Sequence, residues 1–304
     1  CNSGSIQQEH LEAVDEDDPV KPYLEQGWNT ICSIIGTDFL PYLPSVLPTL
    51  IEQAKAEQII KLVDEGDEVD QDEQWDVYSL AGNLVALHTA VLDDKIDAIE
   101  ILKSYADILK GSFYPYVPLI VKEILLPALD FYFHDGVRNS AVEALPTFLS
   151  CAKIAQPPRS PELMSLWSAI ASKLIESLAG EPLTDILVSY YTSFSNCVLL
   201  MGEDTLNENQ LAAFVTSVNA NLQGVYNRIK ERDEADNSEE QYDEGLEEEN
   251  NEFTDEELLD EINKAISGVF KFSNYKFLPA FQELTPTLTT FLVEDNKALK
   301  LCGL

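Results

Sequence analysis

The chain contains 304 residues, of which 45% are hydrophobic and 9% aromatic, so it has enough apolar side chains to build a substantial core. With 54 acidic and 19 basic residues, its formal net charge is -35. A field of this sign repels nucleic acid and anionic membranes, so we expect neither as a partner, and it attracts cationic proteins.

The N-terminal residues 1–19 are polar and end in an acidic run, which indicates a linker or the end of a preceding repeat. The chain starts with Cys1 instead of Met and stops at Leu304 within an apolar helical pattern. We therefore interpret it as an internal piece of a longer protein. No signal peptide is visible, none of the five cysteines forms a CxxC pair, and no apolar run approaches the ~20 residues that span a bilayer. A soluble protein of a reducing, intracellular compartment is expected.

From residue 20 onward, apolar residues recur at steps of three and four, which predicts helices and not strands. The breaks between these stretches carry turn and cap residues, for example Gly36-Thr37-Asp38 and Gly202-Glu203-Asp204. The expected helices span about 20–35, 38–55, 93–110, 113–133, 136–155, 161–179, 183–202, 207–231, 254–272 and 275–293, and another begins near 296.

An internal repeat favours one architecture over others. The stretch Phe39–Leu43 recurs as Phe113–Val117 and as Phe277–Phe281, at separations of 74 and 164 residues. These are close to two and four units of ~40 residues, the period of HEAT-type helix pairs. We expect an all-α HEAT-repeat superhelix in which each pair buries its apolar seam against neighbouring pairs. A compact helical bundle is the alternative.

The expected repeats cover 20–61, 93–133, 134–180, 181–232 and 253–293, and a further repeat starts at 294–304. Proline in each copy should occupy the first turn of a helix, and a second proline (Pro48, Pro127 or Pro286) should bend it.

Two acidic segments interrupt the repeats. Residues 62–92 should form an irregular insertion, and residues 233–252 should form a mobile loop because like charges repel at this density. The end of the second segment offers a capping box, with Thr254 as the cap of the next helix and Glu257 as its partner. The acidity of the chain could also serve only solubility.

Nothing in the sequence indicates catalysis. His10, His88 and His134 are scattered and lack metal-ligand spacing, and no phosphate loop, GxGxxG or GxSxG motif occurs. We expect no catalytic, cofactor-binding or metal-binding residues.

Acidic residues on expected second helices suggest a partner-binding strip. Glu123 and Asp130 lie seven residues apart and should share a helix face. Glu162 and Glu176, with Trp167 and Ser172, form a similar set on the next pair, in which Trp167 would pack on Lys or Arg stems. The alternative interpretation is solvated carboxylates and a core tryptophan.

The octapeptide Phe131-Tyr132-Phe133-His134-Asp135-Gly136-Val137-Arg138 is the most specific motif. Its end resembles the Asp/Arg ladder that links repeats in HEAT proteins. Asp135 would accept hydrogen bonds from a helix start, Val137 would pack in the seam, and Arg138 would reach a neighbouring repeat.

This octapeptide, together with Phe39–Ile51, Trp75-Asp76, Met201–Glu203 and the acidic run before Phe253, resembles the importin-beta (karyopherin-beta) superfamily of nuclear import receptors, and most closely its importin five branch. The resemblance covers nearly the whole chain. It implies a receptor that moves between cytoplasm and nucleus, binds basic nuclear-localisation signals of cargo such as ribosomal proteins and histones on its inner face, releases them to Ran-GTP, and contacts Phe-Gly nucleoporins. The receptor's N-terminal repeats, a major Ran contact in this family, are missing from the chain.

Two other functions remain open at this point. One is a structural HEAT scaffold or adaptor. The other is an acidic chaperone that binds basic proteins through residues 231–261 alone.

Overall fold

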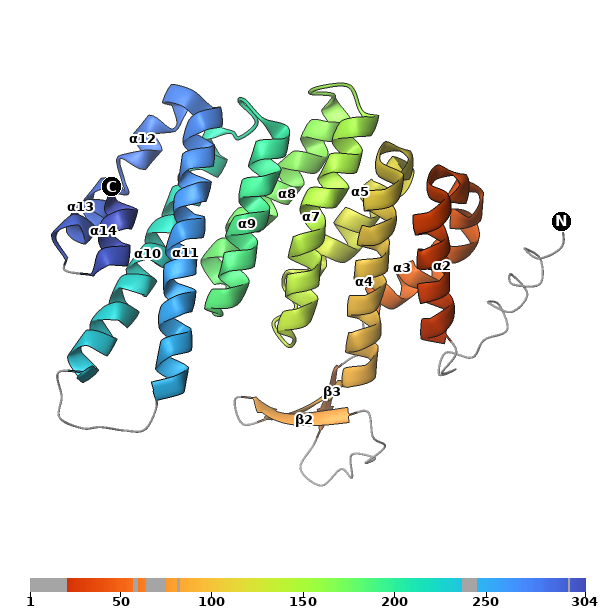
Figure 1. Ribbon diagram of the computed structural model, residues 1–304, viewed down its shortest axis with the longest axis horizontal. Coiled ribbons are helices and arrows are strands. Elements are labelled where there is room, and N and C mark those ends of the chain that lie inside the picture. The colour runs from red at the N-terminus through yellow and green to blue at the C-terminus, as the bar shows by residue number, and fades with distance from the viewer. Residues whose placement is uncertain (1–20, 57–59, 64–74, 81–82, 237–244, 295) are drawn as a thin grey trace. The chain divides into compact units, whose positions relative to one another are not determined.

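The computed structural model describes residues 21–56, 60–63, 75–80, 83–236, 245–294 and 296–304 (Figure 1). The chain divides into two compact units, residues 1–155 and 156–304. This division falls inside the expected repeat 134–180, between its two helices.

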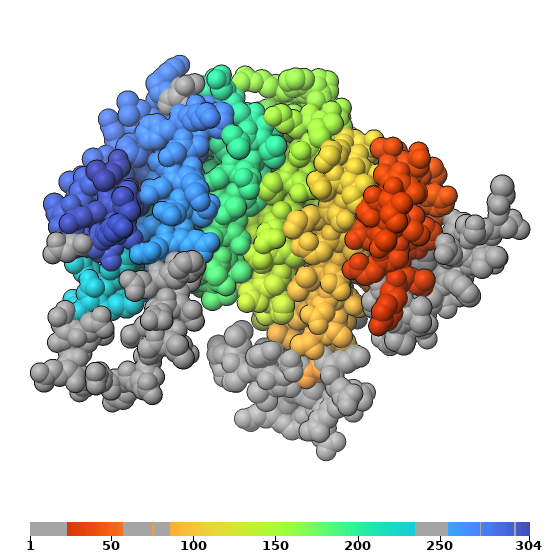
Figure 2. Space-filling view, in the orientation of Figure 1, coloured from red at the N-terminus to blue at the C-terminus, as the bar shows by residue number. Residues whose placement is uncertain are grey.

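The first unit is built from helix pairs in two rows (Figure 1). One row contains α2 (Lys21–Ile35), α4 (Thr89–Leu109) and α7 (Asp135–Ala155), which pack in that order. The other row contains α3 (Leu43–Lys55) and the broken helix formed by α5 (Val117–Ile120), η3 (Val121–Leu125) and α6 (Leu126–Ala128). In Figure 2, the visible face of this unit is formed mainly by the helices of the first row.

Polar side chains tie these helices together. The buried Lys95 ammonium of α4 donates to the carbonyl of Ala54, 2.6 Å away, at the end of α3. Ser104 of α4 donates to Asn29 of α2 at 2.8 Å. Hydrogen bonds of this kind fix the register of neighbouring pairs, which apolar packing alone would specify less sharply.

The repeated Phe-x-Pro motif has a common structural role. Phe39, Phe113 and Phe277 are fully buried, and the first two lie in the 3-10 segments η1 (Gly36–Tyr42) and η2 (Lys110–Tyr116). The expectation that the motif proline opens an α-helix is therefore wrong for Pro41 and Pro115, which lie inside the 3-10 segments. The following helices instead have Pro44 and Pro118 in their first turns. The 3-10 turn lets the chain reverse while the aromatic ring stays in the core.

The second prolines also differ in effect. Pro48 lies inside α3, whereas Pro127 and Pro286 each stand in the first turn of a new short helix. A single α-helix over 113–133 is not observed: the run changes from 3-10 in η2 to a π-helical turn in η3 and ends at Ala128. Pro127 supplies no N–H for the preceding turn, which accords with the irregular hydrogen bonding there.

Residues 60–88 depart from the expected irregular insertion and from an all-helical chain. The described residues of this range form a three-stranded antiparallel sheet of β1 (Ile60–Val63), β2 (Trp75–Leu80) and β3 (Asn83–His88) in the order β1-β3-β2. The register pairs Ile60 with Leu87 and Trp75 with His88. Aromatic and β-branched residues within the acidic sequence favour strands.

The second unit again has two rows of helices (Figure 1). One row contains α9 (Thr184–Met201), α11 (Gly245–Ser273) and α14 (Lys297–Gly303). The other row contains α8 (Pro161–Gly180), α10 (Glu208–Asp236), and α12 (Leu278–Phe281) with α13 (Thr285–Val293); the short η4 (Asn274–Lys276) precedes α12. At the start of α10, Asn207 and Gln210 hydrogen-bond reciprocally through their backbone N–H groups, at 3.1 and 3.0 Å.

The second acidic segment is more helical than expected. α10 continues to Asp236 and α11 begins at Gly245, so a loop over 233–252 is wrong in extent. The capping box is also wrong, because Thr254 lies inside α11. Residues 237–244 lie outside the described residues, as do the expected linker at 1–19 and most of the acidic residues of the first insertion.

One stretch, Tyr23–Lys55, is long and apolar enough to cross a membrane by length and composition, contrary to the expectation from sequence. In the structure it comprises α2, η1 and α3, and its apolar residues Cys32, Phe39 and Leu50 are buried in the first unit. Core helices of soluble proteins pass the same test, so this is weak evidence for a membrane segment.

Candidate partner-binding surface

In the first unit, the candidate Glu123 links two repeats. It lies on η3 and forms an ion pair with Lys55 at the end of α3. The hydrogen bond and charge of Lys55 lower the pKa of the Glu123 carboxyl. The side chain is thus partly engaged within the protein.

Asp130 does not share a helix face with Glu123. α6 ends at Ala128, and Asp130 lies exposed in the turn that follows. The argument from a seven-residue spacing fails here because it requires one continuous helix.

In the second unit, Glu162, Ser172 and Glu176 are exposed on α8. Glu176 lies 3.4 Å from the ammonium of Lys173, and the Ser172 hydroxyl accepts a hydrogen bond from Gln210 of α10 at 3.0 Å. α8 therefore presents two carboxylates, one of them beside a lysine.

Trp167 corrects the expectation from sequence. Its side chain is fully buried, and its indole N–H donates to the carbonyl of Thr205 at 2.9 Å. It belongs to the core, as the alternative interpretation held, and does not offer a ring to a partner. Its neighbours at helical spacing, Leu163, Ile170 and Leu174, are buried with it.

The octapeptide forms the junction between α6 and α7. The Asp135 carboxylate accepts from the N–H of Gly136 at 2.8 Å, and Val137 is fully buried. Arg138 is 2% exposed; its guanidinium donates to the carbonyl of Phe131 at 3.1 Å and lies 5.4 Å from the ring centroid of Tyr132. Arg138 thus ties the start of α7 back to the preceding turn.

Polar contacts connect successive second helices of the second unit. Asn221 of α10 donates to the carbonyl of Leu178 at 2.9 Å, and the Ser217 hydroxyl donates to that of Ile175 at 3.1 Å. These side chains occupy the inward side of α10 and leave its outer side to other residues.

The side chains on the outer side of α8 and α10 are mostly small or polar, and several are acidic. We define the α8–α10 face as the exposed residues Glu162, Ser165, Ser168, Ala169, Ser172, Glu176, Ala179, Glu208, Asn209, Ala212, Ala213, Thr216, Ala220 and Gln223. Within residues 161–180 and 208–227 the only basic residue is Lys173, which is paired with Glu176. An extended chain could approach this face closely because few long side chains cover it.

A buried carboxylate fixes the far end of α10 and was not found from the sequence. Asp255 of α11 is 2% exposed; it accepts a hydrogen bond from Arg228 at 2.9 Å and forms an ion pair with Arg232 at 2.8 Å. The two arginines are four residues apart and so lie on one side of α10. Their partner is more than twenty positions away in an acidic run, so no local pattern identified it.

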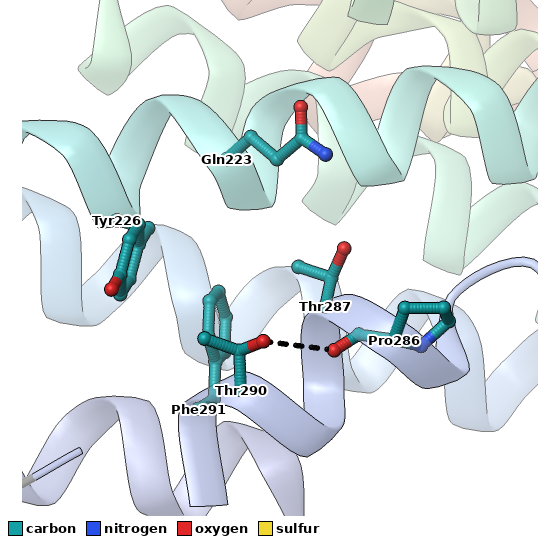
Figure 3. A pocket seen from close by; sticks show the side chains of 6 residues that line it. All are labelled: Gln223, Tyr226, Pro286, Thr287, Thr290 and Phe291. Carbon is teal, nitrogen blue, oxygen red and sulfur yellow. Dashed lines mark hydrogen bonds between the residues drawn. The ribbon is translucent and has the colours of Figure 1, made fainter. Parts of the chain in front are cut away.

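A pocket of about 230 Å³ lies between α10 and α13 (Figure 3). Gln223 and Tyr226 face it from α10, and Pro286, Thr287, Thr290 and Phe291 face it from α13. Next to it, Glu294 accepts from Tyr226 at 2.8 Å and from Lys230 at 2.5 Å, and these hydrogen bonds lower the pKa of Glu294.

The buried cysteine thiols are not activated as nucleophiles. Burial raises the pKa of the Cys32 and Cys151 thiols to about 11 and that of Cys302 to about 12, and it also raises the pKa of Cys197. These thiols stay protonated near neutral pH and are poor nucleophiles. Across the described ranges, no three His, Cys, Asp or Glu side chains are grouped to hold a metal ion.

Comparison with known proteins shows which proteins this chain resembles. A family model described as Importin repeat 6 matches residues 186–294. Importin subunit beta-3 of Saccharomyces cerevisiae is 44% identical over 293 residues, which are 96% of this chain and 26% of that protein.

Two crystal structures of Kap121p, one bound to Nup53p and one bound to Pho4p, are similar in sequence and fold. Each has a TM-score of 0.82 and 42% identity, and each match covers 94% of this chain and 26% of the Kap121p chain. The chain spans about a quarter of the length of these relatives. It has the HEAT-repeat superhelix as its fold class, is a close homologue of importin subunit beta-3, and belongs to the importin (karyopherin) family.

Proposed function

We propose that this chain is a segment of a nuclear import receptor that shuttles between cytoplasm and nucleus and binds basic, localisation-signal-bearing proteins on an acidic surface. Its homology to an importin supports transport and not catalysis. Because the relatives are about four times longer, cargo release by Ran-GTP and contacts with Phe-Gly nucleoporins belong to the full-length receptor.

The observation that carries the proposal is the α8–α10 face. Its exposed carboxylates are separated by Ser, Ala, Thr, Asn and Gln, and the one lysine on these stretches is paired. Such a surface suits an extended segment rich in Lys and Arg, whose charges would find complementary potential without steric obstruction. Ribosomal proteins and histones have the required charge.

The test compares two charge variants of the 304-residue chain. A fluorescent lysine-rich localisation peptide is titrated with wild type, with Glu162→Gln/Glu176→Gln, and with the control Glu256→Gln, which removes an exposed carboxylate from α11. We expect the double variant to bind about fivefold more weakly, since each exposed ion pair contributes roughly 0.5 kcal/mol. The control should match wild type.

Equal affinity of all three proteins would reject the α8–α10 face as the binding surface. In the full-length receptor, addition of Ran-GTP should release the peptide. Retention of the peptide would argue for the scaffold alternative.

The acidic-chaperone alternative has a test of its own. Deletion of residues 237–249 removes the segment that joins α10 to α11 together with the first five residues of α11, and with them much of the acidic run. Binding that survives this deletion excludes the chaperone function, whereas binding that is abolished supports it and contradicts our proposal.

A further inference from the structure

Residues 277–294, which contain α12 and α13, are anchored firmly at their first residue. Phe277 is fully buried, and its ring centroid lies 6.3 Å from that of Phe214 on α10 and 4.8 Å from that of Phe270 on α11. Aromatic rings packed in a core have little freedom to move, because protein interiors are close-packed. Phe277 is therefore a fixed point of this segment.

The far end of the segment is held by a polar contact. Glu294 accepts hydrogen bonds from Tyr226 at 2.8 Å and from Lys230 at 2.5 Å, and both donors belong to α10. The side chains of Lys230 and Glu294 are 38% and 18% exposed, so water and salt reach this ion pair. Ion pairs in such surroundings are weak and are screened by salt. We call the contact of Glu294 with Tyr226 and Lys230 the Glu294 latch.

Between its two ends the segment is broken and loosely packed. α12 ends at Phe281 and α13 begins at Thr285, and neither start has a side-chain cap. The structure describes every residue of these two helices, and among them Phe291 alone is buried. The pocket of about 230 Å³ lies between α13 and α10 (Figure 3). The break and the pocket leave α13 room to move relative to α10.

The neighbouring junction, between α8 and α10, is built differently. The Ser217 hydroxyl of α10 donates to the carbonyl of Ile175 at 3.1 Å. The Asn221 amide of α10 donates to the carbonyl of Leu178 at 2.9 Å. A main-chain carbonyl inside a helix cannot move separately from that helix, so these hydrogen bonds fix α8 against α10.

In the part of the chain that the structure describes, α10 and α13 are joined through side chains. Besides the Glu294 latch, the Thr287 hydroxyl donates to the Asn219 side chain at 2.6 Å. The rings of Tyr226 and Phe291 stack with centroids 5.8 Å apart. Side chains can follow a small shift of a helix by changing rotamer, which a carbonyl cannot do. This junction therefore resists movement less than the junction of α8 with α10.

A movement of α13 would carry α14 with it. α14 packs on α13 so closely that a Cβ atom at Gly303 would lie 2.8 Å from the carbonyl oxygen of Leu288. The hydrogen bond between α14 and α11, from the Cys302 thiol to Asn263 at 3.4 Å, is a weak one. We therefore expect α13 and α14 to move as one body.

We propose that residues 277–294 form a strap that pivots at Phe277 and that the Glu294 latch holds closed against α10. Release of the latch lets α13 and α14 swing away from α10, so the spacing of the second helices in this unit changes at this one junction. The hinge does not depend on what the α8–α10 face binds, so it can be tested without a partner.

Pairs of spin labels measure the movement by pulsed electron paramagnetic resonance. In a Cys1→Ser background the four remaining cysteines are buried, so the labels attach to introduced cysteines. One protein carries labels at Ala220→Cys on α10 and Thr289→Cys on α13. The reference protein carries them at Ala169→Cys on α8 and Thr216→Cys on α10. These four positions are exposed.

Each labelled protein is measured with the latch intact, with Glu294→Gln, and with the control Glu283→Gln, which removes an exposed carboxylate from the same segment. Glu294→Gln should lengthen the mean distance between α10 and α13 by about 1–2 Å, the usual size of helix shifts at interfaces, and broaden its distribution. Glu283→Gln should change neither. The distance between α8 and α10 should stay the same in all three proteins.

Salt tests the latch without a substitution in it. Raising NaCl from about 0.05 M to about 0.5 M should lengthen the distance between α10 and α13 while Glu294 is present, because salt screens a partly exposed ion pair. In Glu294→Gln the added salt should have no further effect. Circular dichroism spectra verify that the variants are folded.

Three results would overturn the latch. One is a distance between α10 and α13 that neither Glu294→Gln nor salt changes. Another is an equal change in the distance between α8 and α10, which would show general loosening of the unit. The third is an equal effect of Glu283→Gln, which would assign the movement to loss of charge and not to the contact of Glu294 with α10.

Discussion

The two acidic insertions have similar composition and different structures. The described residues in and just before the first form three short strands, β1, β2 and β3. The second is bounded by helices that continue from the repeats into the acidic run, α10 as far as Asp236 and α11 from Gly245. The first insertion contains Trp75-Asp76-Val77-Tyr78, whose aromatic and β-branched residues favour strands. The second is dominated by Glu, a good helix former. The amount of negative charge therefore did not determine local structure; the strand or helix preference of the residues in each insertion did.

The two insertions also differ in their attachment. α10 and α11 are joined beside the second insertion by the ion pairs of Arg228 and Arg232 with the buried Asp255. In the first insertion, the main contacts of the strands described are with one another. We therefore expect the second insertion to be coupled to the stability of its unit and the first to be largely independent.

Removal of the Asp255 carboxylate should have the largest effect. Asp255→Ala leaves two arginines without their shared partner, and we expect a loss of about 2–3 kcal/mol in the free energy of unfolding. This value lies at or below the usual cost of breaking a buried pair because both arginines reach solvent. Urea denaturation measures it, with the exposed Glu257→Ala as control. Equal stability of the two variants would remove the distinction between the insertions.

Substitution of Trp75 should have a smaller and local effect. Trp75→Ala removes the edge-to-face contact with His88, whose ring centroid is 4.7 Å away. We expect the free energy of global unfolding to change by less than about 0.5 kcal/mol, because local opening can occur without loss of the helix stack. Hydrogen exchange should show faster exchange in 75–88 and unchanged exchange in α4. Faster exchange throughout α4 would show that the sheet supports the helices.

The ion pair of Glu294 should give the smallest effect and a defined dependence on pH. The hydrogen bonds from Lys230 and Tyr226 lower the pKa of Glu294 below 4.5 in the folded state, so its contribution to stability is present above that value and is lost as the pH falls. The difference in stability between wild type and Glu294→Gln should shrink from neutral pH to below pH 4.5. The control Glu283→Gln, on the same surface, should show less change. A difference that grows on acidification would contradict the assignment.

The sequence predicted the helices well wherever apolar residues recur at steps of three and four, as in α7, α8 and α9. The buried Phe39, Phe113 and Phe277 identified the repeat because each copy needs the same aromatic residue at its turn. Trp167 shows the limit of an argument from residue type. Its buried neighbours at helical spacing already indicated the core, whereas its proximity to acidic residues suggested a surface role.

The wrong predictions concern segments whose helix bounds depend on contacts between residues far apart in the sequence, or whose helical pattern is hidden by many acidic residues. Thr254 looked like a helix cap, yet α11 begins nine residues earlier, and Asp255 within it is held by α10. Glu123 and Asp130 were placed on one face because the π-helical turn η3 and the end of the helical run at Ala128 were not anticipated. No periodicity in the sequence reports the contacts of Asp255, since they join helices separated by the acidic run.

Photo-crosslinking would test the central claim most directly. A lysine-rich peptide that carries a photoreactive residue is irradiated with the 304-residue chain, and the attachment sites are mapped by mass spectrometry. We predict adducts on the outer side of α8 and α10. Adducts confined to residues 237–249, or spread evenly over both units, would contradict the account.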